Sequence, residues 1–378
     1  MVFPHPLRGC WLAMSIVSIF RAALVAWLFS ASVHAAQVPD LFQGEVLVSD
    51  QTQSSRAEAN QRALAQVLVK LSGSRQGISP AALVGAENMV LKFQYAQRAY
   101  APVPGMFEAP ISELMLQSNF DAVLAQQKQR AMGLPEWGRE RPAPLVLIAL
   151  DGLGAKVLLL NPQGTPPRMF ADSARRRGLP FEWARGNLLT AEMMFSADDA
   201  TLAQALRQVE APAYLLGRIE RAAGGGWVGR WTLIDERGAE TWSLADANAR
   251  RTIEAGAEGA ADRLAARYSS RAGQAAAQSI TLVVGGVNSL NDYARLTAYL
   301  RGLSLATRID PIEADGGTLT FRLALTTSID RFTQVLGFGR VLSIERADDA
   351  SIAEISLSQG SSVQEPVRLD ELRVFLRP

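Results

Sequence analysis

Every histidine and cysteine of this 378-residue chain lies within the first 35 residues. The two histidines are His5 and His34, and the single cysteine is Cys10. The chain that follows residue 35 therefore has no disulfide and no thiolate or imidazole metal centre to hold it together. Its domains must be stabilised by apolar cores alone, and a chain that is 48% hydrophobic has enough apolar residues to build them.

The first 35 residues have the layout of a secretory signal peptide. Arg21 precedes the short apolar run Ala22–Phe29, and Val33-His34-Ala35 places small or β-branched residues around a cleavage site before Ala36. A basic start, a short apolar core and a small-x-small exit are typical of export signals. We therefore expect residues 1–35 to be removed on secretion through the inner membrane, which leaves a periplasmic protein.

Two other interpretations of this segment are an uncleaved membrane anchor and a lipoprotein signal. The apolar stretch Ala22–Ser32 is shorter than the ~20 residues that a membrane span needs. Cys10 does not fit a lipoprotein site, because Arg8 stands where a small residue is required. We expect no stable membrane span after cleavage. Met14 is an alternative start to Met1, since the segment from Met14 onward is a complete signal.

The charge balance of the mature chain is close to neutral. Arg8 and Arg21 are the only charged residues of the leader, so 36 of the 38 basic residues and all 37 acidic residues remain after cleavage. A surface with a net charge of about −1 has no electrostatic preference for nucleic acid or for anionic lipid. We therefore expect no nucleic-acid partner.

The pattern of the remaining chain predicts an α+β protein made of three small αβ domains. Two linkers separate them: a polar stretch with two prolines, Gly138–Pro144, and a stretch of small residues, Arg271–Gln278. The expected domains span residues 36–138, 139–273 and 279–378. The last has the order strand, helix, strand, strand, helix, strand, which is the split βαβ pattern of ferredoxin-like folds.

Apolar periodicity places the elements of the first two domains. In the first domain we expect strands Leu41–Val48, Lys92–Tyr100 and Glu113–Phe120, a helix that a Ser55–Glu58 capping box begins and Gly73 ends, and a helix Asp121–Met132. In the second we expect strands Leu145–Leu150, Leu179–Ala184, Ala213–Glu220, Trp227–Asp235 and Glu240–Leu244, with helices Met169–Arg177, Asp198–Gln208 and Asn248–Tyr268.

Apolar periodicity also places the elements of the third domain. We expect strands Ile280–Val287, Ala306–Ile312, Leu319–Thr326 and Val341–Ser343, and helices Leu290–Leu300 and Ile329–Leu336. Ala353–Leu357 and Leu372–Leu376 are candidates for additional edge strands.

Several long stretches resemble an uncharacterised proteobacterial family, the domain of unknown function 2066. They are Ser55-Arg56-Ala57-Glu58-Ala59 running into Ala63–Gly73, Gly133–Gly138 before Arg141-Pro142, Leu216-Gly217-Arg218, and Trp227-Val228-Gly229-Arg230-Trp231. The resemblance covers roughly Leu41 to Tyr268 and implies no activity.

The central domain also resembles the small αβ domain at the start of TolB and the curli-secretion and penicillin-binding-protein-activator lipoproteins. The tract from Ala213 to Tyr268 carries this likeness, with a three-stranded meander and a closing alanine-rich helix. The resemblance implies an adaptor for envelope machinery and no enzymatic role.

The residue types that remain restrict catalysis to carboxylate chemistry. Triads and imidazole or thiolate metal sites need His or Cys, so we expect no catalytic residue of that kind, no metal and no cofactor. Glycosidases need only two carboxylates, and Asp151, Asp235, Glu236 and Asp310 lie at strand ends. Turns are the favoured explanation of Asp151 and Asp235-Glu236, because Asp early and Gly late are typical of β-turns.

Three other motifs have plain structural explanations. Gly224-Gly225-Gly226 lies between two apolar strands with no helix after it, which favours a hairpin tip over a phosphate loop. Gly285–Ser289 joins a strand to a helix, and Ser289 as a helix cap accounts for it without an anion. Arg175-Arg176-Arg177 suits a solvated helix end, where cations oppose the helix dipole; an anionic-glycan patch is the alternative.

Trp227 and Trp231 are the candidate contact residues for a partner or ligand. They are four apart in one predicted strand, so both indoles lie on one face with Gly229 between them. If that face is buried, the pair is core; if it is exposed, the pair is a platform for a sugar ring or a partner protein.

The function that these observations favour is a periplasmic binding or scaffold protein of the bacterial envelope, without catalysis, whose partner is another envelope protein. It would bind through sheet edges or interdomain grooves. The alternative is a carboxylate-dependent hydrolase of envelope polysaccharide. A third hypothesis is a small-ligand binding protein with a pocket between the second and third domains.

Overall fold

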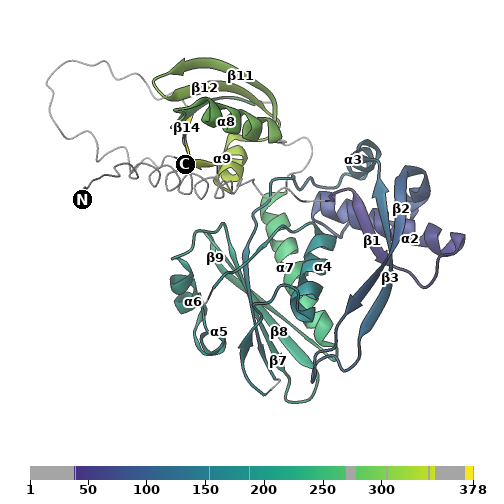
Figure 1. Cartoon of the computed structure of the whole chain (residues 1–378). Coiled ribbons are helices and arrows are strands. Elements are labelled where there is room, and N and C mark those ends of the chain that lie inside the picture. Colours follow the sequence, from purple (N-terminus) through teal and green to yellow (C-terminus); the bar gives the residue numbers. More distant parts are fainter. Residues whose placement is uncertain are drawn as a thin grey trace, which may run out of the picture. The chain divides into compact units, whose positions relative to one another are not determined.

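The computed structural model describes residues 38, 40–152, 154–186, 188–269, 278–303, 305–338, 341–344 and 371–377. The expected signal peptide lies outside these residues. Helices and sheets alternate in the described chain, so the predicted α+β class is confirmed. Three sheets are present in this part of the chain, one within residues 43–120, one within 145–246 and one within 278–376 (Figure 1).

The first sheet has three antiparallel strands in the order β1-β3-β2. Its elements are β1 (Gln43–Leu47), α2 (Gln53–Ser72), the short 3₁₀ helices η1 (Pro80–Leu83) and η2 (Ala86–Met89), β2 (Val90–Tyr100), β3 (Ile111–Phe120) and α3 (Ala122–Ala131). Helix α2 lies on one face of the sheet, where Leu64, Val67 and Leu68 are fully buried. Asp121 caps α3 as predicted, because its carboxylate accepts from the amides of Val123 and Leu124.

Helix α2 begins one turn earlier than the capping box predicts. The cap is Thr52, whose hydroxyl accepts from the Ser55 amide at 3.3 Å, so Ser55 lies inside the first turn. Asp50 accounts for the shift, because its carboxylate accepts from the amide and the hydroxyl of Thr52 at 2.9 and 2.6 Å. These bonds hold Thr52 in the extended conformation that an N-cap residue needs. The helix ends at Gly73, as predicted, in the left-handed conformation.

The second sheet has the order β5-β4-β7-β8-β9, with β6 paired to β4. Its elements are β4 (Leu145–Asp151), β5 (Val157–Leu158), α4 (Thr165–Arg177), β6 (Glu182–Trp183), α5 (Ala191–Ser196), α6 (Asp199–Leu206), β7 (Tyr214–Arg221), β8 (Trp227–Asp235), β9 (Gly238–Asp246) and α7 (Ala249–Tyr268). Strands β7, β8 and β9 form the predicted meander. Helices α4 and α7 lie side by side on one face (Figure 1).

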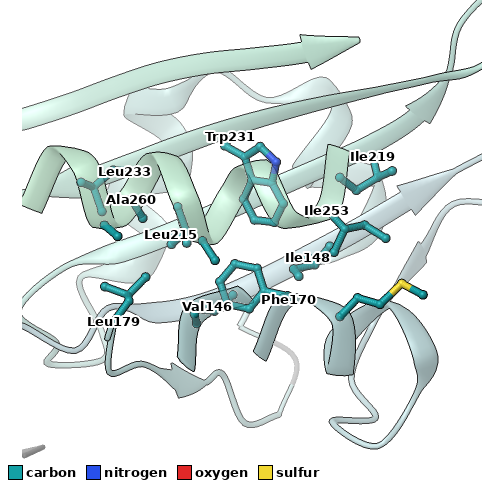
Figure 2. Close-up of a cluster of buried hydrophobic side chains, with 14 of the residues drawn as sticks. Val146, Ile148, Phe170, Leu179, Leu215, Ile219, Trp231, Leu233, Ile253 and Ala260 are labelled. Carbon is teal, nitrogen blue, oxygen red and sulfur yellow. The ribbon is translucent and has the colours of Figure 1, made fainter. Parts of the chain in front are cut away.

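Trp231 is the centre of the core under α4 and α7. Its ring stacks on Phe170 of α4 with centroids 5.6 Å apart, and Figure 2 shows the two side chains next to each other. The indole nitrogen donates to the Thr252 carbonyl of α7 at 2.9 Å. Two glycines leave room for the ring: a Cβ added at Gly217 or at Gly256 would lie 2.4 Å from it. The alanine-rich helix α7 is therefore able to approach the sheet closely.

The third sheet has the order β11-β12-β10-β14-β13. Its elements are β10 (Gln278–Gly285), α8 (Leu290–Gly302), β11 (Ala306–Asp315), β12 (Thr318–Leu325), α9 (Ile329–Phe338), β13 (Leu342–Ile344) and β14 (Glu371–Leu376). Strand β12 lies between β10 and β11, which is the split βαβ arrangement that the sequence predicts. Ser289 caps α8 by accepting from the Asp292 amide.

The C-terminal strand departs from the prediction of an edge strand. β14 lies inside the sheet, parallel to β10 on one side and antiparallel to β13 on the other. In a ferredoxin-like fold, the fourth strand would pair with the first at this position. Val374 and Leu376 point into the core of the domain and are 1% and 7% exposed. Burial of these alternate apolar side chains stabilises the strand in the interior of the sheet. The candidate strand Ala353–Leu357 lies outside the described residues.

The close contact between Trp231 and α7 predicts that Gly256→Ala lowers the stability of the domain, although alanine favours a helix. Helix propensity alone favours alanine by roughly 1 kcal/mol. The added methyl group would meet the indole at 2.4 Å, so we expect a net destabilisation of about 1–3 kcal/mol from overpacking. Urea unfolding followed by tryptophan fluorescence measures this. Gly224→Ala is the control, since no atom lies within 4 Å of its added Cβ; a stabilised Gly256→Ala variant would show that the helix is not closely packed.

Candidate interaction surface

The two tryptophans predicted as contact residues are both in the core. Trp227 is 4% exposed and Trp231 is fully buried. Helix α7 covers the face of β8 that the two indoles share. The pair is therefore part of the core, and it does not form an exposed platform for a ligand or partner. Trp137, at the junction of the first two domains, is buried as well and its amide donates to the Leu71 carbonyl at 2.7 Å.

The candidate carboxylates do not meet. Asp151 ends β4 beside Glu220, whereas Asp235 ends β8 beyond the pair Tyr214–Ile234, at the opposite end of the same sheet. A seven-residue strand separates these ends by roughly 20 Å, far more than the ~9.5 Å that an acid–base pair tolerates. Asp235 forms an ion pair with Arg267. In the described part of the chain, no three His, Cys, Asp or Glu side chains are placed to hold a metal ion.

Exposed apolar side chains gather instead at one end of the first domain. Four of them, Val84, Leu91, Val123 and Leu124, are 70%, 70%, 61% and 42% exposed, and we call this group the apolar tip. With Phe93, 47% exposed on β2, they make up five of the twelve exposed large apolar side chains of the described residues. Clustered exposed apolar side chains are typical of interaction surfaces.

Leu91 and Val123 are brought together by the pairing of β2 with β3. Val90 is the partner of Phe120, and Leu91 follows Val90 while Val123 lies three residues after Phe120. The register shifts at this point, so Leu91 is the extra residue of a β-bulge. Bulges redirect side chains at sheet edges, and this one leaves Leu91 in solvent.

A side-chain hydrogen bond links α3 to the 3₁₀ helix η1, which ends just before Val84. The Lys128 ammonium donates to the Ala82 carbonyl at 2.5 Å. Leu124 lies four residues before Lys128 and therefore on the same face of α3. The bond connects this face of α3 to a residue two positions before Val84, so η1, β2 and α3 each contribute to the tip.

The tip lies at the end of a long edge strand. β2 is the last strand of its sheet, eleven residues long, and among the described residues its only strand partner is β3. One row of its backbone donors and acceptors is therefore left for another chain. Phe93 and Tyr95 stand on the face toward α2 with ring centroids 6.0 Å apart, and Arg56 of α2 lies over the Phe93 ring at 4.9 Å.

The other long edge strands carry prolines or acids that β2 lacks. β11 includes Pro311, two register shifts and the acids Asp310, Glu313 and Asp315. β9 includes the acids Glu240 and Asp246. Proline and charged residues on edges discourage pairing with another strand. β2 has neither proline nor acid, and Lys92 is its only exposed charge.

The face of the first sheet opposite α2 is fixed to the second domain by a buried ionic cluster. Asp172 of α4 accepts from the Tyr100 hydroxyl at 2.6 Å and contacts the guanidinium groups of Arg175 and Arg98 at 2.5 and 3.4 Å. Burial, together with the hydrogen bond to Asp172, raises the pKa of Tyr100 to about 12. The phenol is therefore a neutral donor at physiological pH.

Further ion pairs extend this cluster on both sides. Glu45 of β1 pairs with Arg98 and Arg175, and Glu113 of β3 pairs with Arg250 of α7. Arg176 and Arg177 pair with acids of α7, Glu254 and Asp262. The run Arg175–Arg177 was predicted as a solvated helix end, and this prediction is wrong because its three side chains all form ion pairs with acids on other elements.

Arg141 joins the ends of two helices at the domain junction. Its guanidinium donates to the carbonyls of Lys70 and Gly178 at 2.7 and 2.5 Å, and lies 3.8 Å from the Trp137 ring centroid. Lys70 is in the last turn of α2 and Gly178 caps α4, so one cation meets two negative helix ends. Burial lowers the pKa of Arg141 to about 9, which keeps it charged at neutral pH.

Comparison with known proteins gives a match for the first domain. Residues 35–138 match a family described as a domain of unknown function, DUF8605. This stretch contains the apolar tip and β2. No curated protein matches the chain. Over the described residues, no helix combines the length and the apolar character that a membrane span requires.

Lys70 makes a pH-dependent contribution to stability. It is 2% exposed and its ammonium donates to the carbonyls of Asp40 and Gln43. Burial lowers its pKa from 10.5 to about 8. Between pH 8 and 10.5 the unfolded chain therefore binds more protons than the folded one, and the free energy of unfolding rises with pH.

We expect this rise to reach about 3 kcal/mol across that window. Lys70→Met removes this titrating group. The other titratable groups are the same in both proteins, so their contributions to the pH dependence cancel in the difference. The measurement is the difference in urea unfolding free energy between wild type and Lys70→Met from pH 7.5 to 10.5. Parallel pH profiles for the two proteins would contradict the prediction.

Proposed function

We propose that this chain is an exported, periplasmic, non-catalytic protein of the bacterial envelope that binds another envelope protein through its first domain. The observation that carries the proposal is the open edge of β2 with the apolar tip at its end. The export signal expected in residues 1–35 supports the location, and the matched family stretch begins where that signal ends. The likeness to family 2066 and to TolB-type adaptor domains belongs to the same proposal.

The edge of β2 suits strand addition by an extended segment of the partner. Backbone hydrogen bonds along an edge strand supply affinity, and pockets for alternate side chains supply specificity. The apolar tip would bury the partner's apolar residues at one end of the added strand. Anchors of this kind carry most of the binding energy of an interface.

The basic residues at this edge indicate the charge of the partner segment. Lys92 is exposed on β2 and Arg56 stands over Phe93, and β2 has no acid. A segment with an acidic residue therefore complements this edge. The proposal thus commits to a different protein with an apolar, acidic strand.

The hydrolase alternative has no observation in its favour. Asp151 and Asp235 lie at opposite ends of the second sheet, and Asp310 is paired with Arg308 on a strand of another sheet. No carboxylate pair of the kind the hypothesis needs is formed by these residues.

The proposal is tested by cross-linking in the periplasm with tip variants. Wild-type protein should capture one reproducible partner, and Leu91→Glu combined with Val123→Glu should reduce its yield at least about tenfold, because two buried anchors are worth several kcal/mol. Leu160→Glu and Leu290→Glu are the matched controls, since these residues are 51% and 83% exposed outside the tip.

The outcome is read from the two sets of variants together. Partner capture that the tip variant and the controls reduce equally would reject the tip as the binding surface. Circular dichroism of each variant checks that the exposed substitutions leave the fold intact.

A further inference from the structure

The outer edge of β1 is covered by side chains of α2. Strand β1 is the second edge of the first sheet, because the strand order is β1-β3-β2. Three α2 residues that lie four apart, Arg62, Gln66 and Lys70, each bond to backbone groups of β1. Residues at this spacing lie on one face of a helix. Helix α2 therefore directs a row of polar side chains at the edge, and we call these three residues the covering row.

Gln66 takes the place of a neighbouring strand at the middle of β1. Its carboxamide accepts from the Glu45 amide at 2.6 Å and donates to the Glu45 carbonyl at 3.1 Å. The Val48 amide donates to the Leu114 carbonyl of β3, and alternate residues of an antiparallel strand point to opposite sides, so Glu45 points away from β3. The side chain thus satisfies both outward groups of this residue, as a peptide group of another strand would.

The backbone on either side of Glu45 is covered in the same way. The Lys70 ammonium donates to the Gln43 carbonyl at 2.8 Å. The Arg62 guanidinium donates to the Leu47 carbonyl at 3.1 Å. The outward carbonyls of all three residues therefore have a donor from α2. An edge whose backbone groups are already bonded offers little to an added strand.

The outer edge of β2 is built differently. The same alternation directs the backbone groups of Phe93, Tyr95 and Gln97 away from β3. Within the described residues, these groups have no bond of the kind that the covering row makes to β1. One edge of the sheet is therefore closed by side chains, and the other is open along its length.

We propose that the covering row prevents copies of this chain from joining edge to edge. Without it, the open edge β2 of one copy would add to β1 of the next. Such a head-to-tail contact leaves a free edge at each end, so it continues into an open chain of copies. With the row in place, a strand added to β2 leaves β1 closed, and the complex contains one copy of this chain. The inference rests on the open edge of β2 and does not require the proposed envelope partner.

The test compares the mass of the whole exported chain with that of the variant Arg62→Ala combined with Gln66→Ala. Arg62 is exposed and Gln66 is half-buried, so alanine at both positions spares the core and suits a helix. Lys70 is retained because it is buried. Sedimentation equilibrium at roughly 200 µM should give the variant at least about 1.5 times the wild-type weight-average mass, as for a dissociation constant near that concentration.

Two further variants identify the edges that take part. Gln61→Ala is the matched control in the same helix, because Gln61 is outside the covering row, and it should keep the wild-type mass. Gln97→Pro removes an outward amide of β2 and spares the bonds to β3. Added to the double variant, it should restore the wild-type mass. A double variant of wild-type mass, equal association of Gln61→Ala, or association that survives Gln97→Pro would overturn the proposal.

The cover of β1 also has a readout that does not depend on association. In the wild-type protein, the Glu45 amide should exchange its hydrogen at least about tenfold more slowly than the outward amide of Tyr95, because Gln66 accepts from it. Equal exchange of the two amides would overturn the proposal even if the double variant failed to fold. Partner capture by cross-linking is a separate measurement, so failure of the proposed function and failure of this inference are distinguishable.

Discussion

The buried ionic cluster around Asp172 is the constraint on which the arrangement of the first two domains depends. It takes Tyr100 and Arg98 from β2 and Arg175 from α4, so one carboxylate joins a sheet to a helix that lies 72 residues further along the chain. Buried ion pairs add little net stability compared with apolar packing, but removing one partner leaves an uncompensated charge at a cost of about 3–5 kcal/mol. The cluster therefore favours one relative position of these elements over others.

This constraint has a consequence for the proposed partner surface. The C-terminal half of β2 is held by the ionic cluster through Arg98 and Tyr100, whereas its N-terminal half, from Leu91 to Gln94, is exposed. One strand thus serves as an anchor at one end and as an open edge at the other. A fixed edge loses less conformational entropy on binding than a mobile one, which favours affinity.

Much of the fold could be predicted from the sequence, because apolar periodicity is local. The helix that ends at Gly73, the cap at Asp121 and the meander after Ala213 each follow from residues close together in the chain. The interior position of β14 could not be predicted, since it depends on parallel pairing with a strand that lies more than 80 residues earlier. The partners of Arg175–Arg177 escaped prediction for the same reason.

The candidate surface was the hardest part to predict. Leu91, Phe93 and Val123 look like core residues in sequence, and only the sheet order shows that β2 is an edge and that a bulge turns Leu91 outward. The reverse holds for Trp227 and Trp231, which the sequence left open between core and platform. Residue type alone does not separate a buried apolar face from an exposed one.

The claim that β2 presents an unpaired edge is tested most directly by residue-resolved amide hydrogen exchange in the free protein. The account predicts alternation from Lys92 to Tyr100: amides bonded to β3 exchange slowly, and those between them exchange quickly. The amides of β3 from Met115 to Asn119, where a strand lies on each side, should all be protected. Uniform protection along β2 would show that its edge is already covered, and would contradict the account.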